Sequence, residues 1–434
     1  MHSERPAAGF AGADVPSDDV ITNCMHCGLC LPTCPTFSIT GNERSSPRGR
    51  IRLIKAVAEG KLDITPGFVD EMNFCLDCQA CETACPAGVK YGSLVESARD
   101  QIRRAGRERP VAAFLKKVLL RGVLARPAML RFVARLLRMY QRSGLEWFLE
   151  RSGLLRVIAP KLSSLQKLAP RPDAVPFSGT VPEVIRPVGP VRYRVGFLSG
   201  CIMDVAFAGI NDDTVKVLLH HGCEVVVPSG QRCCGSLQAH NGDFESARQL
   251  ARTNIDAFRT HRLDAIVMNS AGCGAMMKEY GHYLKDDPMY AAHAADLSAK
   301  VQDITEFLFT IGLRPPEREF PHTVSYHDAC HLAHSQKVTM QPRALLRSVP
   351  GLQFRELPEA SWCCGSAGIY NVVHHDASVK LLDRKMRNVE IVDADFLVAN
   401  NPGCLLQIEF GRTRTGARTE VLHFATLLRK VYGI

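Results

Sequence analysis

The stretch CMHCGLCLPTCP, from Cys24 to Pro35, places four cysteines within eleven residues and ends on proline. A second stretch, CLDCQACETACP from Cys75 to Pro86, repeats the spacing C-x2-C-x2-C-x3-C-P. This is the spacing of bacterial-type [4Fe–4S] sites, in which three thiolates of a short loop bind one cluster and the fourth binds its neighbour. The two runs therefore predict a pair of [4Fe–4S] clusters.

The crossed pattern exchanges one cysteine between the runs. The first cluster is expected on Cys24, Cys27, Cys30 and Cys85, and the second on Cys75, Cys78, Cys81 and Cys34. A zinc site or structural thiols are the alternatives, but zinc knuckles use two pairs of ligands and not four in one run. Nearby Arg48, Arg50 and Arg52 either tune a cluster electrostatically or form a solvated face.

The remaining cysteines follow a repeated pattern in the last part of the chain. In order, the first copy contains Cys201, Cys233, Cys234 and Cys273, and the second contains Cys330, Cys363, Cys364 and Cys404. Both copies alternate strand-like and helix-like segments, which predicts a mainly parallel sheet with helices on its faces and cysteines at strand ends. Each set is expected to be able to hold a further iron–sulfur cluster.

Each copy contains two adjacent cysteines followed by glycine, in RCCGS and WCCGS. Glycine permits the backbone angles that let both thiols face one site. The alternatives are a buried pair or a strained vicinal disulfide.

The second copy also contains HDACHLAH, with His327, His331 and His334 around its first cysteine. We interpret it as the first-cysteine loop, with histidine ligation of a cluster or a proton relay beside quinone as alternatives. Cys223 has no counterpart in the second copy and is expected in the core.

These copies resemble the CCG domain family, named for heterodisulfide reductase subunits and their relatives. That family ends each copy in C-x-x-C, whereas Ser270 and Asn401 replace the first cysteine of the pair here. The departure argues against a thiol–disulfide reductase. The N-terminal part, with 40 residues between its cysteine runs, resembles the helical two-cluster ferredoxin module of respiratory complexes such as succinate dehydrogenase.

The order of elements resembles the iron–sulfur subunits of glycolate oxidase (glycolate dehydrogenase), and NSAGCGAMMKEYGHYLKDDPMYA is the most discriminating stretch. The resemblance implies an electron-transfer subunit that passes electrons from an FAD-bearing partner toward a quinone-type acceptor while glycolate becomes glyoxylate. The chain has no G-x-G-x-x-G or Walker fingerprint, so no flavin or nucleotide site is expected in it. Subunits for D-lactate or glycerol 3-phosphate, a heterodisulfide-reductase-like enzyme and a regulatory iron–sulfur sensor are the alternatives.

Charge is concentrated in one segment. Residues 103–171 contain seventeen Lys/Arg and three acids, a net charge of +14 within a chain of +9. The segment is interpreted as helical scaffold whose arginines face solvent or an acidic partner, with an interfacial patch on anionic lipid as the alternative. Pro110 and Pro127 are expected to break it. No interleaving of aromatic and basic residues supports nucleic-acid binding.

The chain is expected to be a multidomain α + α/β protein. The predicted domains are a helical ferredoxin-type domain at 1–100, a basic helical linker at 101–190, and CCG domains at 191–315 and 316–434. The N-terminus has no apolar core of a signal peptide, and no uncharged apolar run reaches about 18 residues. The prediction is a cytoplasmic protein with reduced thiols, and a peripheral position on the inner face of the cell membrane is the alternative.

Overall fold

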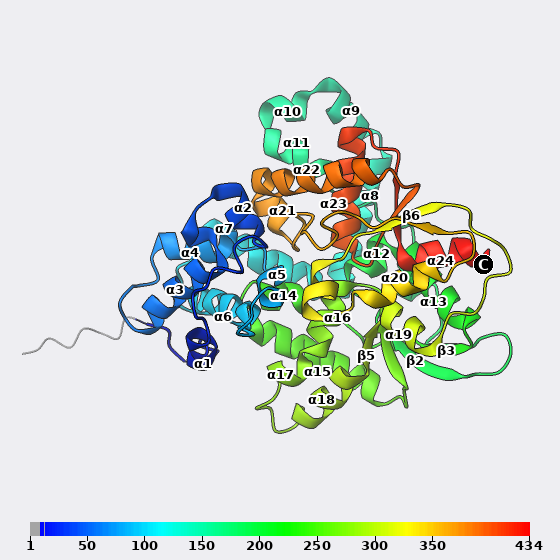
Figure 1. The fold of residues 1–434 in the computed structure, drawn as a ribbon, viewed down its shortest axis with the longest axis horizontal. Helices are drawn as coiled ribbons and strands as arrows, with labels where there is room; N and C mark the ends of the chain where they lie inside the picture. Colours follow the sequence, from blue (N-terminus) through cyan, green and yellow to red (C-terminus); the bar gives the residue numbers. More distant parts are fainter. Residues whose placement is uncertain (1–8, 13) are drawn as a thin grey trace, which may run out of the picture.

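The computed structural model describes residues 9–12 and 14–434. Figure 1 shows a helical N-terminal module (blue) beside two α/β units (green, and yellow to red), with the helices of the middle segment (cyan) along them. The predicted class, a helical ferredoxin-like region followed by two α/β repeats, is confirmed. The domain boundaries stay predictions.

Short helices build the N-terminal module. They are α1 (Asp18–Thr22), α2 (Pro35–Thr40), α3 (Pro47–Ala58), α4 (Pro66–Phe74), α5 (Ala80–Thr83) and α6 (Tyr91–Arg104), with one 3-10 turn, η1 (Glu43–Ser45). Helices α3 and α4 lie between the two cysteine runs. Each begins with proline behind a capping side chain, because Ser46 accepts from Gly49 N (3.0 Å) and Thr65 accepts from Phe68 N (3.2 Å). Their buried faces pack on α6, which fixes the loops that carry the cysteines.

Helices also dominate the middle segment. They are α7 (Pro110–Lys117), the π-helical turn η2 (Val118–Leu124), α8 (Pro127–Arg142), α9 (Leu145–Ser152), α10 (Leu154–Ile158), α11 (Pro160–Gln166) and the 3-10 turn η3 (Phe177–Gly179). Pro110 and Pro127 are the first residues of α7 and α8, so the predicted breaks are confirmed. Proline is tolerated there because the first helical residues need no N–H donor.

The first α/β unit follows the predicted alternation of strands and helices. Its elements are β1 (Val184–Ile185), β2 (Tyr193–Phe197), α12 (Ile202–Ala206), α13 (Ala208–His220), β3 (Cys223–Val226), α14 (Ser236–His240), α15 (Phe244–Arg259), β4 (Ala265–Met268), α16 (Ala271–Lys278), α17 (Tyr280–Tyr283), α18 (Ala291–Lys300), β5 (Val301–Asp303) and α19 (Ile304–Ile311). The sheet order is β1-β3-β2-β4-β5, parallel except for the edge pair β1–β3. Cys223 is fully buried on β3, as predicted.

The second unit repeats this plan with fewer strands. Its elements are β6 (Thr323–Tyr326), the π-helical turn η4 (His331–Ser335), α20 (Met340–Arg347), β7 (Gln353–Phe354), α21 (Tyr370–Val373), α22 (His375–Val392), β8 (Phe396–Ala399), α23 (Pro402–Thr415), β9 (Glu420–His423) and α24 (Phe424–Tyr432). The order β7-β6-β8-β9 is parallel throughout. In both units the carboxyl ends of the strands lead into the cysteine loops, as expected for open α/β sheets.

Equivalent residues join the two units. Asp303 caps α19 and accepts a hydrogen bond from Asn400 Nδ2 across the interface (3.0 Å). Its counterpart His423 caps α24, and its Nε2 bonds to the carbonyl of Asn269 (2.8 Å). One hydrophobic core contains strands and helices of both units. The duplication therefore gives a pseudo-symmetric pair that shares a core.

Candidate iron–sulfur sites

The two cysteine runs of the N-terminal module have the same unusual backbone. His26 and Gly28 in the first run, and Asp77 and Gln79 at the same positions of the second, all have φ between 54° and 86°. Left-handed residues at alternate positions point successive N–H groups inward, and such concavities bind anions and iron–sulfur clusters. Three of the four residues are not glycine, so packing holds both loops in a conformation that isolated peptides seldom adopt.

The structure brings together the cysteines assigned to the first cluster. A small cavity between the two runs is lined by Cys24, Cys27, Cys30 and Cys85, together with Cys81. Cys85 lies far along the chain from the other three, and it reaches them because the second run folds back against the first. Arg48 lies beside this cavity and donates to the carbonyl of His26 (3.1 Å).

The cysteines assigned to the second cluster are more deeply buried. Cys34, Cys75, Cys78 and Cys81 are each at most 9% exposed. Burial raises the pKa values of the Cys78 and Cys81 thiols well above the ordinary range, and neighbouring sulfurs, Cys34 among them, add to the effect. The charge of Cys34 also contributes to raising the pKa of the Cys30 thiol, so the two sets lie next to each other. Buried thiols of this kind need a metal cation to become thiolates, and the donor set suits a [4Fe–4S] cluster.

Of the three arginines after the first run, Arg50 is buried and Arg52 is exposed. Arg50 Nη1 donates to Thr36 Oγ1 (3.1 Å), and the same hydroxyl lies 3.2 Å from Cys34 Sγ. Arg50 Nε donates to the carbonyl of Glu71 (2.8 Å). Arg50 therefore lies close to the predicted cluster ligand Cys34, whereas Arg52 lies on a solvent-exposed face.

The α/β repeats gather their cysteines at the carboxyl ends of the strands. Cys201 follows β2, Cys330 follows β6, and the last cysteine of each set lies in the first turn of α16 or α23. Within each set the thiols interact in sequence, Cys201 with Cys233 and Cys234 with Cys273, then Cys330 with Cys363 and Cys364 with Cys404. All seventeen cysteines lie within the described residues, and in the structure all are free thiols.

The glycine after each cysteine pair has the predicted role. Gly235 has a φ of 90° and Gly365 a φ of 92°. A Cβ on Gly365 would lie 2.6 Å from the carbonyl oxygen of Ser378, so the close packing of α22 also excludes a side chain. Only glycine adopts this conformation without strain while bringing two neighbouring thiols to one site.

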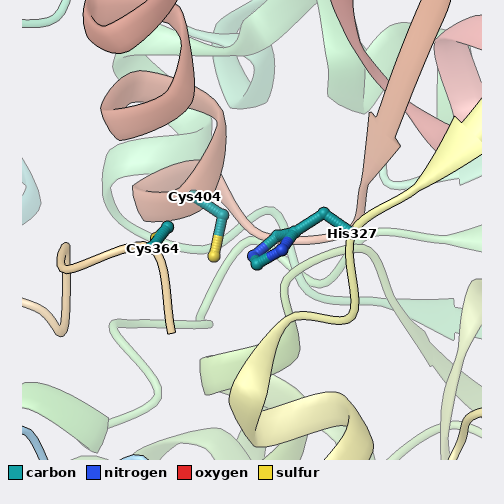
Figure 2. A group of neighbouring side chains, drawn as sticks. All are labelled: His327, Cys364 and Cys404. Carbon is teal, nitrogen blue, oxygen red and sulfur yellow. The ribbon is translucent and has the colours of Figure 1, made fainter. Parts of the chain in front are cut away.

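The histidines of HDACHLAH separate in the structure. His327 faces the repeat's own cysteines, and one of its ring nitrogens, Cys364 Sγ and Cys404 Sγ form a group within 4.8 Å of one another. Figure 2 shows the Cys404 sulfur beside the His327 ring. Burial, together with nearby Lys385, holds the pKa of His327 well below its ordinary value, so the imidazole is neutral. His331 Nδ1 lies 3.5 Å from Cys330 Sγ, whereas His334 turns away to Thr83 (3.0 Å).

The second repeat's cysteines meet the second N-terminal set directly. Cys78 and Cys363 belong to one buried hydrophobic cluster with Trp362 and Tyr370, and the partly buried Cys330 packs against it. The charges of Cys78 and Cys330 also interact. Spacing in the sequence does not predict this contact, because it joins loops about 250 residues apart.

A buried charge network beside this contact was also missed by the sequence analysis. His240 Nδ1 lies 3.1 Å from Asp77 Oδ2 and 2.5 Å from Glu96 Oε1. Tyr283 donates to Glu96 (2.6 Å), and Arg99 lies 3.8 Å from Asp77. Burial opposes charge on His240, but the two carboxylates raise its pKa to about 10. These contacts connect the second cysteine run to the first α/β unit. No sequence motif predicts that these residues interact.

A cavity of about 250 Å³ lies beside the first repeat's cysteines. Cys201 and Cys233 line it on one side, and Leu124, Leu130 and Arg131 from the middle segment line the other. Two arginines of this segment stay about two-fifths exposed and also bond within the chain. Arg121 forms an ion pair with Asp243 (2.7 Å), and Arg131 donates to Ser178 (3.2 Å).

Exposed apolar side chains also follow the helices of the middle segment. On α8, Met129, Phe132, Val133, Leu136 and Met139 are exposed at helical spacing. Exposed apolar residues of α7 and η2 follow the same spacing: Val111, Phe114, Leu115, Val118 and Leu119. Among the described residues, no helix is both long and apolar enough to cross a bilayer.

The fold and the four cysteine sets define an iron–sulfur protein with a dicluster module and two cysteine-rich domains. The family model described as "4Fe-4S dicluster domain" matches residues 20–89, and "Cysteine-rich domain" (CCG) matches 195–278 and 324–409. A third, "Glycolate oxidase iron-sulfur subunit, linker region", matches 112–169. Iron–sulfur clusters are therefore the cofactors of this class.

Full-length relatives identify the particular family. The chain is 40% identical over 421 residues to the "Probable glycolate oxidase iron-sulfur subunit" of Bacillus subtilis, covering 95% of this chain and 94% of the relative. It is 32% identical over 420 residues to the "Glycolate oxidase iron-sulfur subunit" of Escherichia coli, covering 95% of both. The chain belongs to the family of glycolate oxidase iron–sulfur subunits.

Relatives named for lactate match less of the chain. "Lactate utilization protein A" of Oceanobacillus iheyensis is 33% identical over 236 residues, which are 54% of this chain and 96% of that protein. The comparisons thus favour the glycolate oxidase family over the alternatives raised by the sequence.

Proposed function

We propose that this chain is the electron-transfer subunit of a glycolate-oxidising complex whose FAD-bearing partner converts glycolate to glyoxylate. That conversion releases two electrons and two protons, and iron–sulfur clusters bound to this chain carry the electrons singly. The observation that carries the proposal is the buried cluster that contains Cys78 and Cys363, with Cys330 packed against it. It joins the ferredoxin-like module to a CCG domain, so that consecutive cysteine sets form a relay.

The proposed ligand sets follow the geometry of the sites. The N-terminal [4Fe–4S] clusters are held by Cys24, Cys27, Cys30 and Cys85, and by Cys34, Cys75, Cys78 and Cys81. Further clusters are held by Cys201, Cys233, Cys234 and Cys273, and by Cys330, Cys363, Cys364 and Cys404. The left-handed loops and the burial of these thiols support the assignment.

We place the acceptor side of the relay at the middle segment. The 250 Å³ cavity between Cys201 and Leu130 is suited to the head group of a quinone. The exposed apolar face of α7, η2 and α8 lies within a segment of +14 net charge, which favours an anionic lipid surface. A chain docked there, on the cytoplasmic side of the membrane, receives a membrane-soluble acceptor.

The experiment is turnover by the complex of this chain with its flavin partner, purified without oxygen. We expect glycolate-dependent reduction of a quinone analogue, weak activity with D-lactate and none with a heterodisulfide. The flavin partner alone is the control, in which glycolate should reduce the bound FAD once to FADH2 without reduction of the quinone analogue. Turnover of the disulfide but not of glycolate, or full quinone reduction by the partner alone, would refute the proposal. About sixteen irons per chain correspond to four [4Fe–4S] clusters, and about eight to two.

A further inference from the structure

His327 carries a nitrogen donor into the second CCG domain's cysteine set. The residue follows β6 directly, and its side chain is 1% exposed. Neither ring nitrogen has a hydrogen-bond partner, whereas buried polar groups almost always have one. Buried His221 is a contrast, because its Nδ1 bonds to the carbonyl of Val217 (2.8 Å) and its Nε2 accepts from Arg314 N (3.2 Å).

The two CCG domains differ at this position. The residue three before the first cysteine is His327 in the second domain and Leu198 in the first. Leu198 belongs to a hydrophobic core cluster, so the first domain has no nitrogen donor in that place. The histidine is therefore not required by the common fold, and its unpaired nitrogens in the second domain need a separate reason.

Asn401 is already occupied by other contacts. It stands where a fifth thiol would lie, but its Oδ1 accepts from Gly272 N (3.3 Å) and its Nδ2 is 3.6 Å from Cys404 Sγ.

We propose that His327 is a nitrogen ligand of the iron–sulfur cluster in the second CCG domain, beside Cys364 and Cys404. The inference rests on the proposed function only in requiring that this domain binds a cluster. Imidazole is a good ligand for iron. The four cysteines of the set remain ligands, and the imidazole adds a further one without adding negative charge, whereas a thiolate in its place would add charge and lower the cluster's reduction potential. The first domain, with leucine at this place, has no such additional ligand.

The test is pulsed EPR of the whole chain, purified anaerobically with its histidine ring nitrogens labelled with ¹⁵N. We expect a strong ¹⁵N coupling to one reduced cluster in the wild type and its loss in His327→Gln. The matched control is His331→Gln, which alters the histidine beside Cys330 and should leave the coupling intact. In His327→Cys, the iron content should stay at the wild-type value while the potential of this cluster falls.

Three outcomes would overturn the inference. They are no strong ¹⁵N coupling in the wild type, a coupling that survives in His327→Gln, or one that is lost in His331→Gln instead. His327→Cys keeps the test decisive if His327→Gln does not fold, because a retained nitrogen coupling in that variant also contradicts the assignment. Glycolate turnover is measured on the same preparations. Wild-type turnover without nitrogen coupling refutes the ligand and leaves the electron-transfer role standing.

Discussion

Replacing Asp303 by asparagine tests the joint between the two CCG domains. Asp303 is fully buried, caps α19 by accepting from Thr305 N (2.9 Å), and accepts from Asn400 of the other domain (3.0 Å). Its Oδ2 has no hydrogen-bond partner. Burial raises the pKa of Asp303 from 3.8 to about 6. At neutral pH the folded chain therefore holds a carboxylate that would be more stable in water.

The sign and size of the effect follow from these two pKa values. A raised folded-state pKa favours folding below the unfolded pKa of 3.8, and that stability is lost as the pH rises through about 6. The difference is worth about 3 kcal/mol once both states are ionised. Asparagine stays neutral and caps helices equally well. Asp303→Asn should therefore gain about 1 kcal/mol at about pH 4.5 and about 3 kcal/mol at about pH 7.5.

The assay is denaturant unfolding of the anaerobically purified chain, followed by circular dichroism at both pH values. Asp243→Asn is the matched control. Asp243 caps α15, and although burial opposes it, the hydrogen bond from Arg121 lowers the pKa of Asp243. This control should lose stability, and lose more at the higher pH. An Asp303→Asn variant that is no more stable than the wild type at neutral pH, or whose gain does not grow with pH, would refute the reasoning.

The other predictions concern the clusters and the middle segment. Cys34→Ser should remove the EPR signal of the second run's cluster and spare the first, and loss of the first alone would contradict the crossed assignment. Arg50→Met should lower the free energy of unfolding by about 3 kcal/mol, because it breaks buried charged hydrogen bonds; an unchanged denaturation midpoint would count against this. Phe132→Glu should weaken flotation with anionic vesicles, whereas Val372→Glu, at an exposed apolar site outside the segment, should not; equal effects would argue against lipid docking.

Most of the fold could be predicted from the sequence. Cysteine spacing indicated the dicluster module, and the repeat of Cys201, Cys233 and Cys273 at Cys330, Cys363 and Cys404 indicated two related α/β units. These signals are local, because a cluster needs thiolates at fixed separations and a strand or helix needs a fixed period. The partners of the middle segment's arginines could not be predicted, since the ion pair of Arg121 with Asp243 joins residues more than a hundred positions apart in the chain.

The amino-acid sequence by itself determined which residues are available to bind iron, how they are spaced, and that one domain was duplicated. Only the tertiary structure decided which sets meet, by bringing Cys78 to Cys330 and Cys363. It also separated His327, which faces the cysteines, from His334, which does not. The physical reason is that such contacts join loops distant in the chain. The packing of helices and sheets positions those loops, and the residues next to each cysteine in the sequence do not predict that packing.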